Sequence, residues 1–267
     1  MDLVPEDELT EIYRPLAALL VERASAGGRP GPFVVGVTGS VAVGKSTVAA
    51  VLGRLLEDEF PGKVEAVTTD SFLLPNAELE ARGILARKGF PESYDRGLQL
   101  RTLSALRDGV PGVTVPVYSH QVYDILPDRR QVVDRPDVVV VEGINVLQPA
   151  FDLDDRDGGR SPAGDVSLYV DAAEEDVAVW FRARVERLCR EAPPGGDGFF
   201  SHLAALRPDE LATLIDATWT GVNLVNLRTN IAPTRARADL VLRAGPDHRV
   251  EEVLVRAGGP VAGQPGT

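Results

Sequence analysis

The sequence has 267 residues, of which 44% are hydrophobic and 25% charged, a size and composition typical of one large α/β domain with insertions. Its 40 acidic residues outnumber 28 basic ones and give a net charge of -12, so we expect no broad nucleic-acid-binding surface. Cys189 is the only cysteine, which excludes an internal disulfide and a cysteine-rich metal site, and no apolar run is long enough to span a membrane.

An N-terminal helix and a buried strand are the first predicted elements. Apolar residues recur at helical spacing over 6–24, and the glycine-rich stretch 25–31 ends that helix. The run 33–38 is apolar and β-branched, which is typical of a strand buried on both faces. Because the acidic N-terminus does not resemble a signal peptide, we expect a soluble, cytoplasmic protein.

A phosphate-binding loop follows this strand, since residues 39–46 match the pattern G-x-x-x-x-G-K-[ST]. Its glycines allow a tight turn whose backbone N–H groups can approach phosphate oxygens, and the helix predicted over 46–56 points its positive end at the same anion. Lys45 would reach the β- and γ-phosphates, and the Ser46 hydroxyl would hold Mg²⁺. The alternative is a glycine-rich turn without a ligand, which the flanking strand and helix disfavour. The candidate nucleotide-binding residues are Gly39, Ser40, Val41, Ala42, Val43, Gly44, Lys45, Ser46 and Thr47.

Two carboxylates close predicted strands further along the chain. Asp70 follows the strand predicted over 64–68, and Glu142 ends the unbroken apolar run 138–141. Ligands of open parallel sheets bind outside the carboxyl ends of the strands. Asp70 could accept a hydroxyl proton there, or cap a helix or turn instead. Glu142 could hold Mg²⁺, or be a strand-end carboxylate satisfied by a neighbouring helix.

The rest of the chain reads as an elaboration of this core. Residues 73–97 are polar and rich in turn residues, so we expect an excursion with short helices over the active face. His120 follows a predicted strand that Pro116 marks as an edge strand, and taken alone it is more typical of a solvated or capping histidine. Further strands are predicted at 113–118, 166–170, 239–242 and 250–255, and further helices at 98–107, 174–190 and 211–227.

Four arginines crowd the helix predicted over 174–190 in an otherwise acidic chain. They belong either to a solvated helix face or to a lid that faces phosphate groups. They are Arg182, Arg184, Arg187 and Arg190.

A phosphate loop with acidic strand ends indicates phosphoryl transfer. A small-molecule kinase is favoured over a GTPase, since no Asn/Thr-Lys-x-Asp base-reading motif is present, and over a motor, since no partner surface is identifiable. We expect an α/β fold of the P-loop NTPase type, with a mostly parallel sheet flanked by helices and a helical lid and acceptor-binding excursion. A single kinase domain would then span 1–267, with an N-terminal helix at about 1–30, lid and acceptor-binding helices at 174–230 and a disordered tail at 258–267.

Several blocks together resemble the prokaryotic type I pantothenate kinases, which belong with uridine kinase and phosphoribulokinase. The blocks are 39–47, 68–72, 88–95, 116–124, 141–147 and 226–235, with 13–16 resembling the family's N-terminal helix. The resemblance implies a homodimer that uses ATP and Mg²⁺ to phosphorylate the primary hydroxyl of pantothenate to 4′-phosphopantothenate, the first step of coenzyme A biosynthesis. It implies that Asp70 is the base, that Lys45 stabilises the transferring phosphoryl group, and that Ser46 and Glu142 serve the metal. The implied pantothenate-binding residues are Tyr118, His120, Phe181, Arg184 and Asn223.

The chain also departs from the family around the acceptor. Phe181 stands where the family has a tyrosine that contacts pantothenate, and Val185 and Leu188 replace phenylalanines of a neighbouring pocket. Ala50 replaces an arginine that binds inhibitory coenzyme A, and Ser71 replaces a glycine. These differences predict weakened coenzyme A feedback. The alternatives are a divergent paralogue that phosphorylates another small hydroxylated metabolite, or a nucleotide-binding regulatory protein without turnover.

Overall fold

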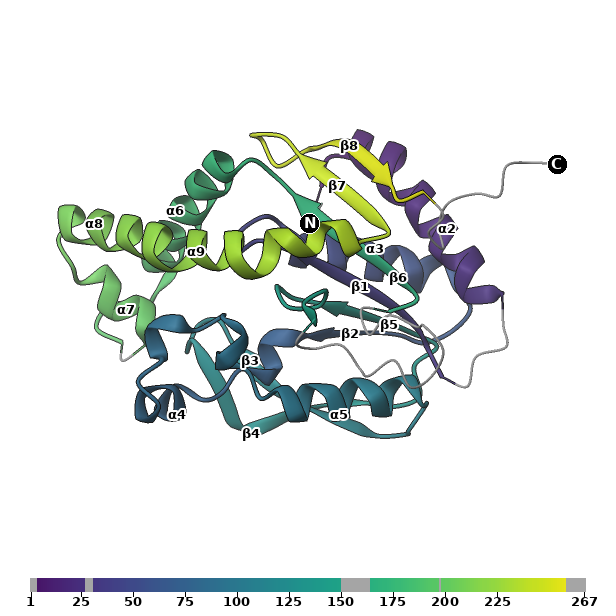
Figure 1. Ribbon diagram of the computed structural model, residues 1–267, viewed down its shortest axis with the longest axis horizontal. Coiled ribbons are helices and arrows are strands. Elements are labelled where there is room, and N and C mark those ends of the chain that lie inside the picture. The colour runs from purple at the N-terminus through teal and green to yellow at the C-terminus, as the bar shows by residue number, and fades with distance from the viewer. Residues whose placement is uncertain (1–3, 27–30, 150–163, 197, 258–267) are drawn as a thin grey trace.

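A computed structural model describes residues 4–26, 31–149, 164–196 and 198–257. Within these residues a six-stranded sheet forms the centre, in the order β2-β5-β1-β6-β7-β8 (Figure 1). The first five strands are parallel, and β8 pairs antiparallel with β7. The strands are β1 (Phe33–Gly39), β2 (Val64–Thr68), β5 (Val138–Glu142), β6 (Val166–Asp171), β7 (Leu240–Ala244) and β8 (Val250–Val255). The predicted α/β fold with a mostly parallel sheet is thus confirmed.

Helices cover the sheet, and most of them begin near the predicted positions. They are α1 (Glu6–Glu8), α2 (Arg14–Ser25), α3 (Lys45–Glu59), α4 (Asn76–Ala81), α5 (Arg96–Arg107), α6 (Glu174–Glu191), α7 (Phe199–Ala204), α8 (Pro208–Thr218) and α9 (Leu224–Asn226). Three π-helical segments, Leu9–Tyr13, Trp219–Asn223 and Leu227–Ile231, extend them. The helix predicted over 211–227 is therefore longer than expected, running from Pro208 to Ile231.

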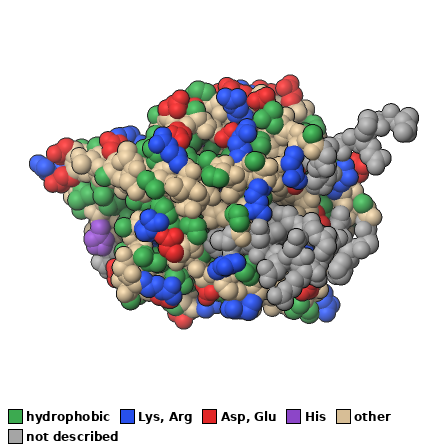
Figure 2. All heavy atoms as spheres, in the orientation of Figure 1, with side chains coloured by type: hydrophobic (Ala, Val, Ile, Leu, Met, Phe, Trp, Pro, Cys, Tyr) green, Lys and Arg blue, Asp and Glu red, His purple; other side chains and the backbone are tan. Residues whose placement is uncertain are grey.

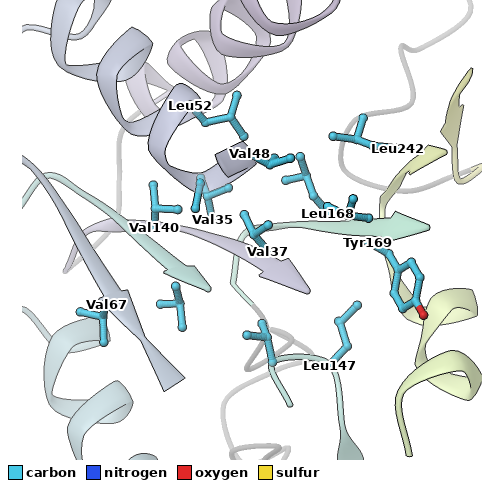
Figure 3. Close-up of a cluster of buried hydrophobic side chains, with 14 of the residues drawn as sticks. Val35, Val37, Val48, Leu52, Val67, Val140, Leu147, Leu168, Tyr169 and Leu242 are labelled. Carbon is cyan, nitrogen blue, oxygen red and sulfur yellow. The ribbon is translucent and has the colours of Figure 1, made fainter. Parts of the chain in front are cut away.

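The hydrophobic core lies between the sheet and these helices. The burial pattern of β1 is buried at every position, as its unbroken apolar run predicts. Val48 and Leu52 of α3 lie over Val35 and Val140 of the sheet (Figure 3). Figure 1 shows the long helical segment through α8 and α9 passing in front of the sheet, with α3 behind it. Figure 2 shows basic and acidic side chains interspersed over the face that this segment crosses.

A separate two-stranded antiparallel sheet, β3 (Val113–Ser119) with β4 (Asp124–Val133), lies beside the main sheet. The predicted strand 113–118 corresponds to β3, and the pairing register shifts between Pro116 and Val117, in keeping with an edge position. β4 was not predicted. Most of its central residues are exposed and polar, so its sequence shows no apolar alternation.

Some predictions fall outside the described residues or await other tests. Residues 151–163 of the acidic stretch 151–164, which the sequence predicts to be an exposed loop, lie outside them, as do residues 27–30 of the glycine-rich break and the predicted tail 258–267. The short helix α7 was not predicted, because the sequence before it reads as a proline-glycine linker. None of the described helices combines the length and apolar character needed to cross a membrane.

Candidate active site

The phosphate-binding loop lies between β1 and α3, as its pattern predicts. Gly39 and Gly44 have φ angles of 144° and 97°, in the region that favours glycine. A Cβ at Gly39 would lie 2.3 Å from the carbonyl oxygen of Val170 on the neighbouring strand, so the close approach also requires glycine. Ala42 has a φ of 61° without being glycine. Strained backbone of this kind is common where a loop must present its N–H groups to a ligand.

Lys45 is the first residue of α3, and its ammonium donates a hydrogen bond to the carbonyl oxygen of Ser40 at 2.7 Å. Lys45 is partly exposed, yet its ammonium is largely removed from water. This burial lowers the pKa of Lys45, and the negative charges of Glu142 and Asp70 oppose the shift. The ammonium is therefore held against the loop by Ser40, within electrostatic reach of both Glu142 and Asp70.

Three hydroxyls around this loop are buried and have no hydrogen-bond partner among the described residues. They are Thr38 Oγ1, Ser40 Oγ and Thr69 Oγ1. Buried polar groups are normally satisfied, so unpaired hydroxyls clustered at a glycine-rich loop fit a site that receives a polar ligand such as a phosphate.

Glu142 and Ser46 form the second feature of the site. β5 ends at Glu142, which the register places beside Val37 of β1 and Thr68 of β2. The Ser46 hydroxyl donates to Glu142 Oε2 at 3.4 Å. A hydroxyl and a carboxylate side by side are hard oxygen ligands that suit Mg²⁺, which usually completes its coordination with phosphates and water. The described residues contain no cluster of three or more histidine, cysteine, aspartate or glutamate side chains that could hold a metal alone.

Asp70 lies in a short 3₁₀ helix, Thr69–Phe72, directly after β2. Thr68 caps this turn, accepting a hydrogen bond on its side chain from the backbone N–H of Asp70 at 3.3 Å, so Asp70 is not the cap. Burial, followed by the charge of Glu142, raises the pKa of Asp70. Electrostatic interactions with His120, Lys45 and Arg184 act in the opposite direction. These charges reach Asp70 from four other parts of the chain, and the sequence-predicted catalytic and metal residues therefore meet in one place.

Tyr118 and His120 bring the small sheet to this place. Their rings lie 5.2 Å apart, edge to face, and the ring of Tyr123 lies 6.3 Å from that of Tyr118. His120 is exposed, yet its ring is covered on the side of Tyr118. This partial burial lowers the pKa of His120, while the charge of Asp70 raises it. His120 is thus a neighbour of Asp70 rather than a distant surface histidine.

Of the arginines on α6, some lie on an exposed helix face and one faces the site, so both predicted roles occur. Arg182 forms an ion pair with Asp216, and Arg187 forms one with Glu191 at 3.1 Å, so both serve an exposed helix face. Arg184 is half-buried and acts on the charges of Asp70 and His120, so it faces the site.

Phe181 lies on α6, and Asn223 lies on the π-helical segment that follows α8. Phe181 is buried, and its ring lies 6.0 Å from that of Trp219. Asn223 closes the π-helical segment Trp219–Asn223 and is half-buried. Within the described part of the chain, its side chain forms no hydrogen bond with the other candidate residues, so its role stays a prediction.

Lys88 is a neighbour of the site that sequence reasoning missed. Its ammonium lies over the rings of Tyr118 and Tyr123, at 5.0 Å and 4.3 Å from their centroids. Burial lowers the pKa of Lys88 to about 8, although the charges of Asp124 and Asp70 oppose the shift. Lys88 belongs to the family-like block 88–95, but no periodicity or spacing singles out one lysine in a loop.

Comparison with known proteins adds evidence on ancestry. The model of the phosphoribulokinase/uridine kinase family matches residues 34–187. A pantothenate kinase of Streptomyces coelicolor is 46% identical over 279 residues, covering 96% of this chain and 83% of the relative. One of Chelativorans sp. is 49% identical over 231 residues, covering 84% and 72%.

Solved structures share the fold. A putative fructose transport system kinase from Silicibacter sp. has a TM-score of 0.66 at 25% identity, covering 86% of this chain and 98% of that one. D-glycerate 3-kinase from Cryptococcus neoformans has a TM-score of 0.63 at 13% identity, covering 92% and 99%. The second likeness concerns the fold alone.

Proposed function

We infer that this chain, which belongs to the phosphoribulokinase/uridine kinase family and within it to the type I pantothenate kinases, phosphorylates pantothenate. The product is 4′-phosphopantothenate, formed from ATP and the primary hydroxyl of the substrate in the first step of coenzyme A biosynthesis. The observation that carries the inference is the 46–49% identity to pantothenate kinases over most of the chain. These relatives do not favour the alternatives of another acceptor or of a nucleotide-binding regulator without turnover.

The phosphate loop would bind ATP through the backbone and side chains of 39–47. Lys45 would contact the transferring phosphoryl group, and its hydrogen bond to the Ser40 carbonyl oxygen, with the charges of Glu142 and Asp70 nearby, supports this role. Ser46 and Glu142 would hold Mg²⁺, which when bound neutralises charge on the phosphates. The donor pair and the unpartnered hydroxyls beside it support this assignment.

Asp70 would take the proton from the acceptor hydroxyl. A carboxylate whose pKa is raised is a stronger base than an ordinary aspartate, and the electrostatic interaction of Asp70 with Lys45 supports a position near the transferring phosphoryl group. Arg184 offers a cation for the carboxylate of pantothenate and for the transition-state charge. Tyr118, His120 and Asn223 offer hydrogen-bonding groups for the hydroxyls and amide of the substrate.

We further propose that this enzyme is only weakly inhibited by coenzyme A. Ala50 is exposed on α3, where an arginine side chain would have room, and Phe181 is committed to packing against Trp219. Ala50→Arg should therefore strengthen inhibition by coenzyme A without changing KM for pantothenate. Wild-type inhibition that is competitive with ATP and as strong as in other type I enzymes would contradict this proposal.

We also propose that residues 1–267 form one kinase domain, with the 174–230 region as its lid, and that it works as a cytoplasmic homodimer. Sedimentation equilibrium would test the dimer.

The function itself is tested by incubating the purified protein with ATP, Mg²⁺ and one acceptor at a time, followed by mass spectrometry of the product. Pantothenate, uridine and D-glycerate are the informative acceptors, because the last two represent other kinases of this fold. We expect phosphorylation of pantothenate in strong preference. Turnover of another acceptor in preference to pantothenate would overturn the proposal.

A further inference from the structure

The connection between β3 and β4 carries His120 and is held in an unusual conformation. Tyr123, at its end, has a φ of 59°, a left-handed conformation that bulky residues rarely adopt. Such strain persists only where the surrounding structure holds it in place. Here the Tyr123 carbonyl oxygen accepts two hydrogen bonds, from Asn76 Nδ2 at 3.0 Å and from Lys88 Nζ at 2.5 Å.

Lys88 does more than contact this carbonyl. It also donates to Asn76 Oδ1 at 2.6 Å, and its ammonium lies over the rings of Tyr118 and Tyr123. Asp124 Oδ1 accepts from the backbone N–H of Asn76 at 3.0 Å and therefore joins the start of α4 to β4. Lys88 forms no ion pair with any described residue. Its hydrogen bonds instead go to two neutral oxygens, Asn76 Oδ1 and the Tyr123 carbonyl oxygen, and these bonds hold the hairpin.

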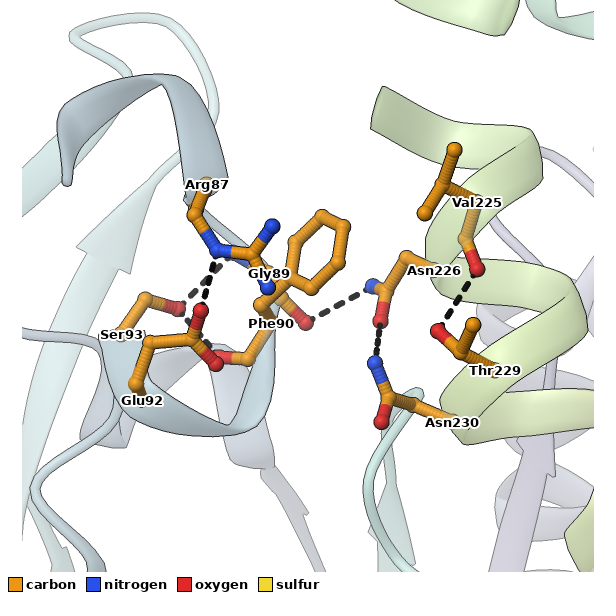
Figure 4. A network of polar contacts seen from close by, with 9 residues as sticks. All are labelled: Arg87, Gly89, Phe90, Glu92, Ser93, Val225, Asn226, Thr229 and Asn230. Atoms are coloured by element: carbon orange, nitrogen blue, oxygen red, sulfur yellow. Dashed lines mark hydrogen bonds and ion pairs between the residues drawn. The ribbon is translucent and has the colours of Figure 1, made fainter. Parts of the chain in front are cut away.

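The next residue, Gly89, contacts the helical segment that carries Asn223, which we take as the second wall of the acceptor site. Gly89 has a φ of 95°, and its carbonyl oxygen accepts a hydrogen bond from Asn226 Nδ2 at 2.9 Å (Figure 4). Asn226 is 5% exposed, and its Oδ1 accepts from Asn230 Nδ2 at 2.9 Å. Asn226 lies three residues after Asn223 on the same helical segment. The hydrogen bond from the buried Asn226 side chain to the Gly89 carbonyl oxygen fixes this helical segment against the 73–97 excursion.

We propose that Lys88 and Asn226 are positioning residues for the phosphoryl acceptor, acting through the Lys88–Gly89 dipeptide that joins the two walls of its site. This proposal rests on the proposed function. Lys88 holds the hairpin with Tyr118 and His120, and Asn226 holds the helix with Asn223. Neither needs to touch the acceptor. Because phosphoryl transfer depends on the hydroxyl lying in line with the phosphoryl group, a shift of either wall by about 1 Å would cost on the order of a hundredfold in rate.

Lys88→Met tests the proposal, since it keeps the length of the side chain and removes its three donors. Arg87→Met is the matched control. Arg87 is the adjacent cation on the same loop, but it pairs with Glu92 and lies 3.9 Å over the ring of Phe90, away from the hairpin. We expect Lys88→Met to lower kcat/KM for pantothenate by about tenfold or more, with KM for ATP changed less than about twofold. Arg87→Met should leave both near wild type.

Asn226→Leu removes the hydrogen bond to the Gly89 carbonyl oxygen and should also lower kcat/KM for pantothenate. The double variant with Lys88→Met should lose less than the product of the two single losses, because both contacts maintain one geometry. If Lys88→Met does not fold, Asn76→Ala, which removes the other hydrogen bond to the Tyr123 carbonyl, carries the same prediction.

Hydrogen exchange of the free protein gives a readout that does not depend on any acceptor. Backbone amides over 119–125 should exchange faster in Lys88→Met than in wild type or Arg87→Met. Faster exchange in Lys88→Met, together with no pantothenate turnover by the wild type, would refute the proposed function but not the role of Lys88 in holding the hairpin. If Lys88→Met keeps wild-type exchange and wild-type kcat/KM, the positioning role of Lys88 is refuted while the proposed function is not. A loss of ATP affinity in Lys88→Met as large as its loss of kcat/KM would also refute the positioning role.

Discussion

Replacing Asp70 with asparagine separates its chemical role from its effect on stability. The asparagine keeps the shape of the side chain and removes the group that accepts the proton. General base catalysis by a positioned side chain contributes about 10²- to 10⁴-fold, so kcat should fall by that factor while ATP binding persists. ATP binding is expected to survive because the phosphate loop and Lys45 do not depend on this side chain for their backbone geometry.

The same substitution should make the folded protein more stable. Burial and the charge of Glu142 raise the pKa of Asp70, so the folded state binds the proton more tightly than the unfolded state does. The ionised carboxylate is the form that folding disfavours, and the neutral amide removes this cost. Because the side chain is partly exposed and the charges of Lys45 and Arg184 offset part of this cost, the gain should be modest, about 0.5 to 1 kcal/mol, which raises Tm by about 1 to 4 °C.

Steady-state kinetics and thermal unfolding at several pH values measure both effects. The stability advantage of Asp70→Asn should shrink as the pH falls through the folded pKa of Asp70, where the wild-type carboxyl takes up its proton. For the same reason, kcat/KM of the wild type should decline on the acid side at a higher pH than an ordinary aspartate would give. Near-normal turnover by the variant, or a lower Tm at neutral pH, would refute this reasoning.

Two further substitutions test the frame that holds the site. A Cβ at Gly143 would lie 1.8 Å from Thr69 Oγ1, so Gly143→Ala should destabilise the protein by about 1–3 kcal/mol in urea unfolding, whereas Gly53→Ala, with open space around the new methyl group, should not. Equal free energies of unfolding for Gly143→Ala and Gly53→Ala would show that Gly143 does not pack tightly against Thr69. Asp239 accepts from the backbone N–H and the hydroxyl of Ser167 at 2.9 and 2.7 Å, so Asp239→Ala should cost about 2–4 kcal/mol in the same assay. A loss below about 0.5 kcal/mol would contradict that account.

The main sheet could be predicted because its strands have unmistakable patterns. Val138 to Val141 form an unbroken valine run that only a doubly covered parallel strand explains, and the phosphate loop places one strand and one helix by itself. β4 could not be predicted, because Arg129 and Arg130 interrupt it and its partner is a single edge strand. β4 forms because it pairs with β3, and the sequence of β4 alone does not indicate this pairing.

The candidate site divides in the same way. Asp70 and Glu142 could be predicted, since parallel strands end at a common edge whatever the loops do. Lys88 and Asn226 could not, because their contacts join irregular segments that are 12 to 137 residues apart in sequence. Phe181 was predicted as a departure from the family, but its packing against Trp219 needed the three-dimensional arrangement.

Initial-rate measurement of ATP consumption with and without pantothenate tests the central claim most directly. The account predicts turnover at roughly 1–100 per second with pantothenate and Mg²⁺, with one 4′-phosphopantothenate formed for each ATP consumed, and negligible consumption without the acceptor. ATP consumption at the same rate with and without pantothenate, and no phosphorylated product, would contradict it.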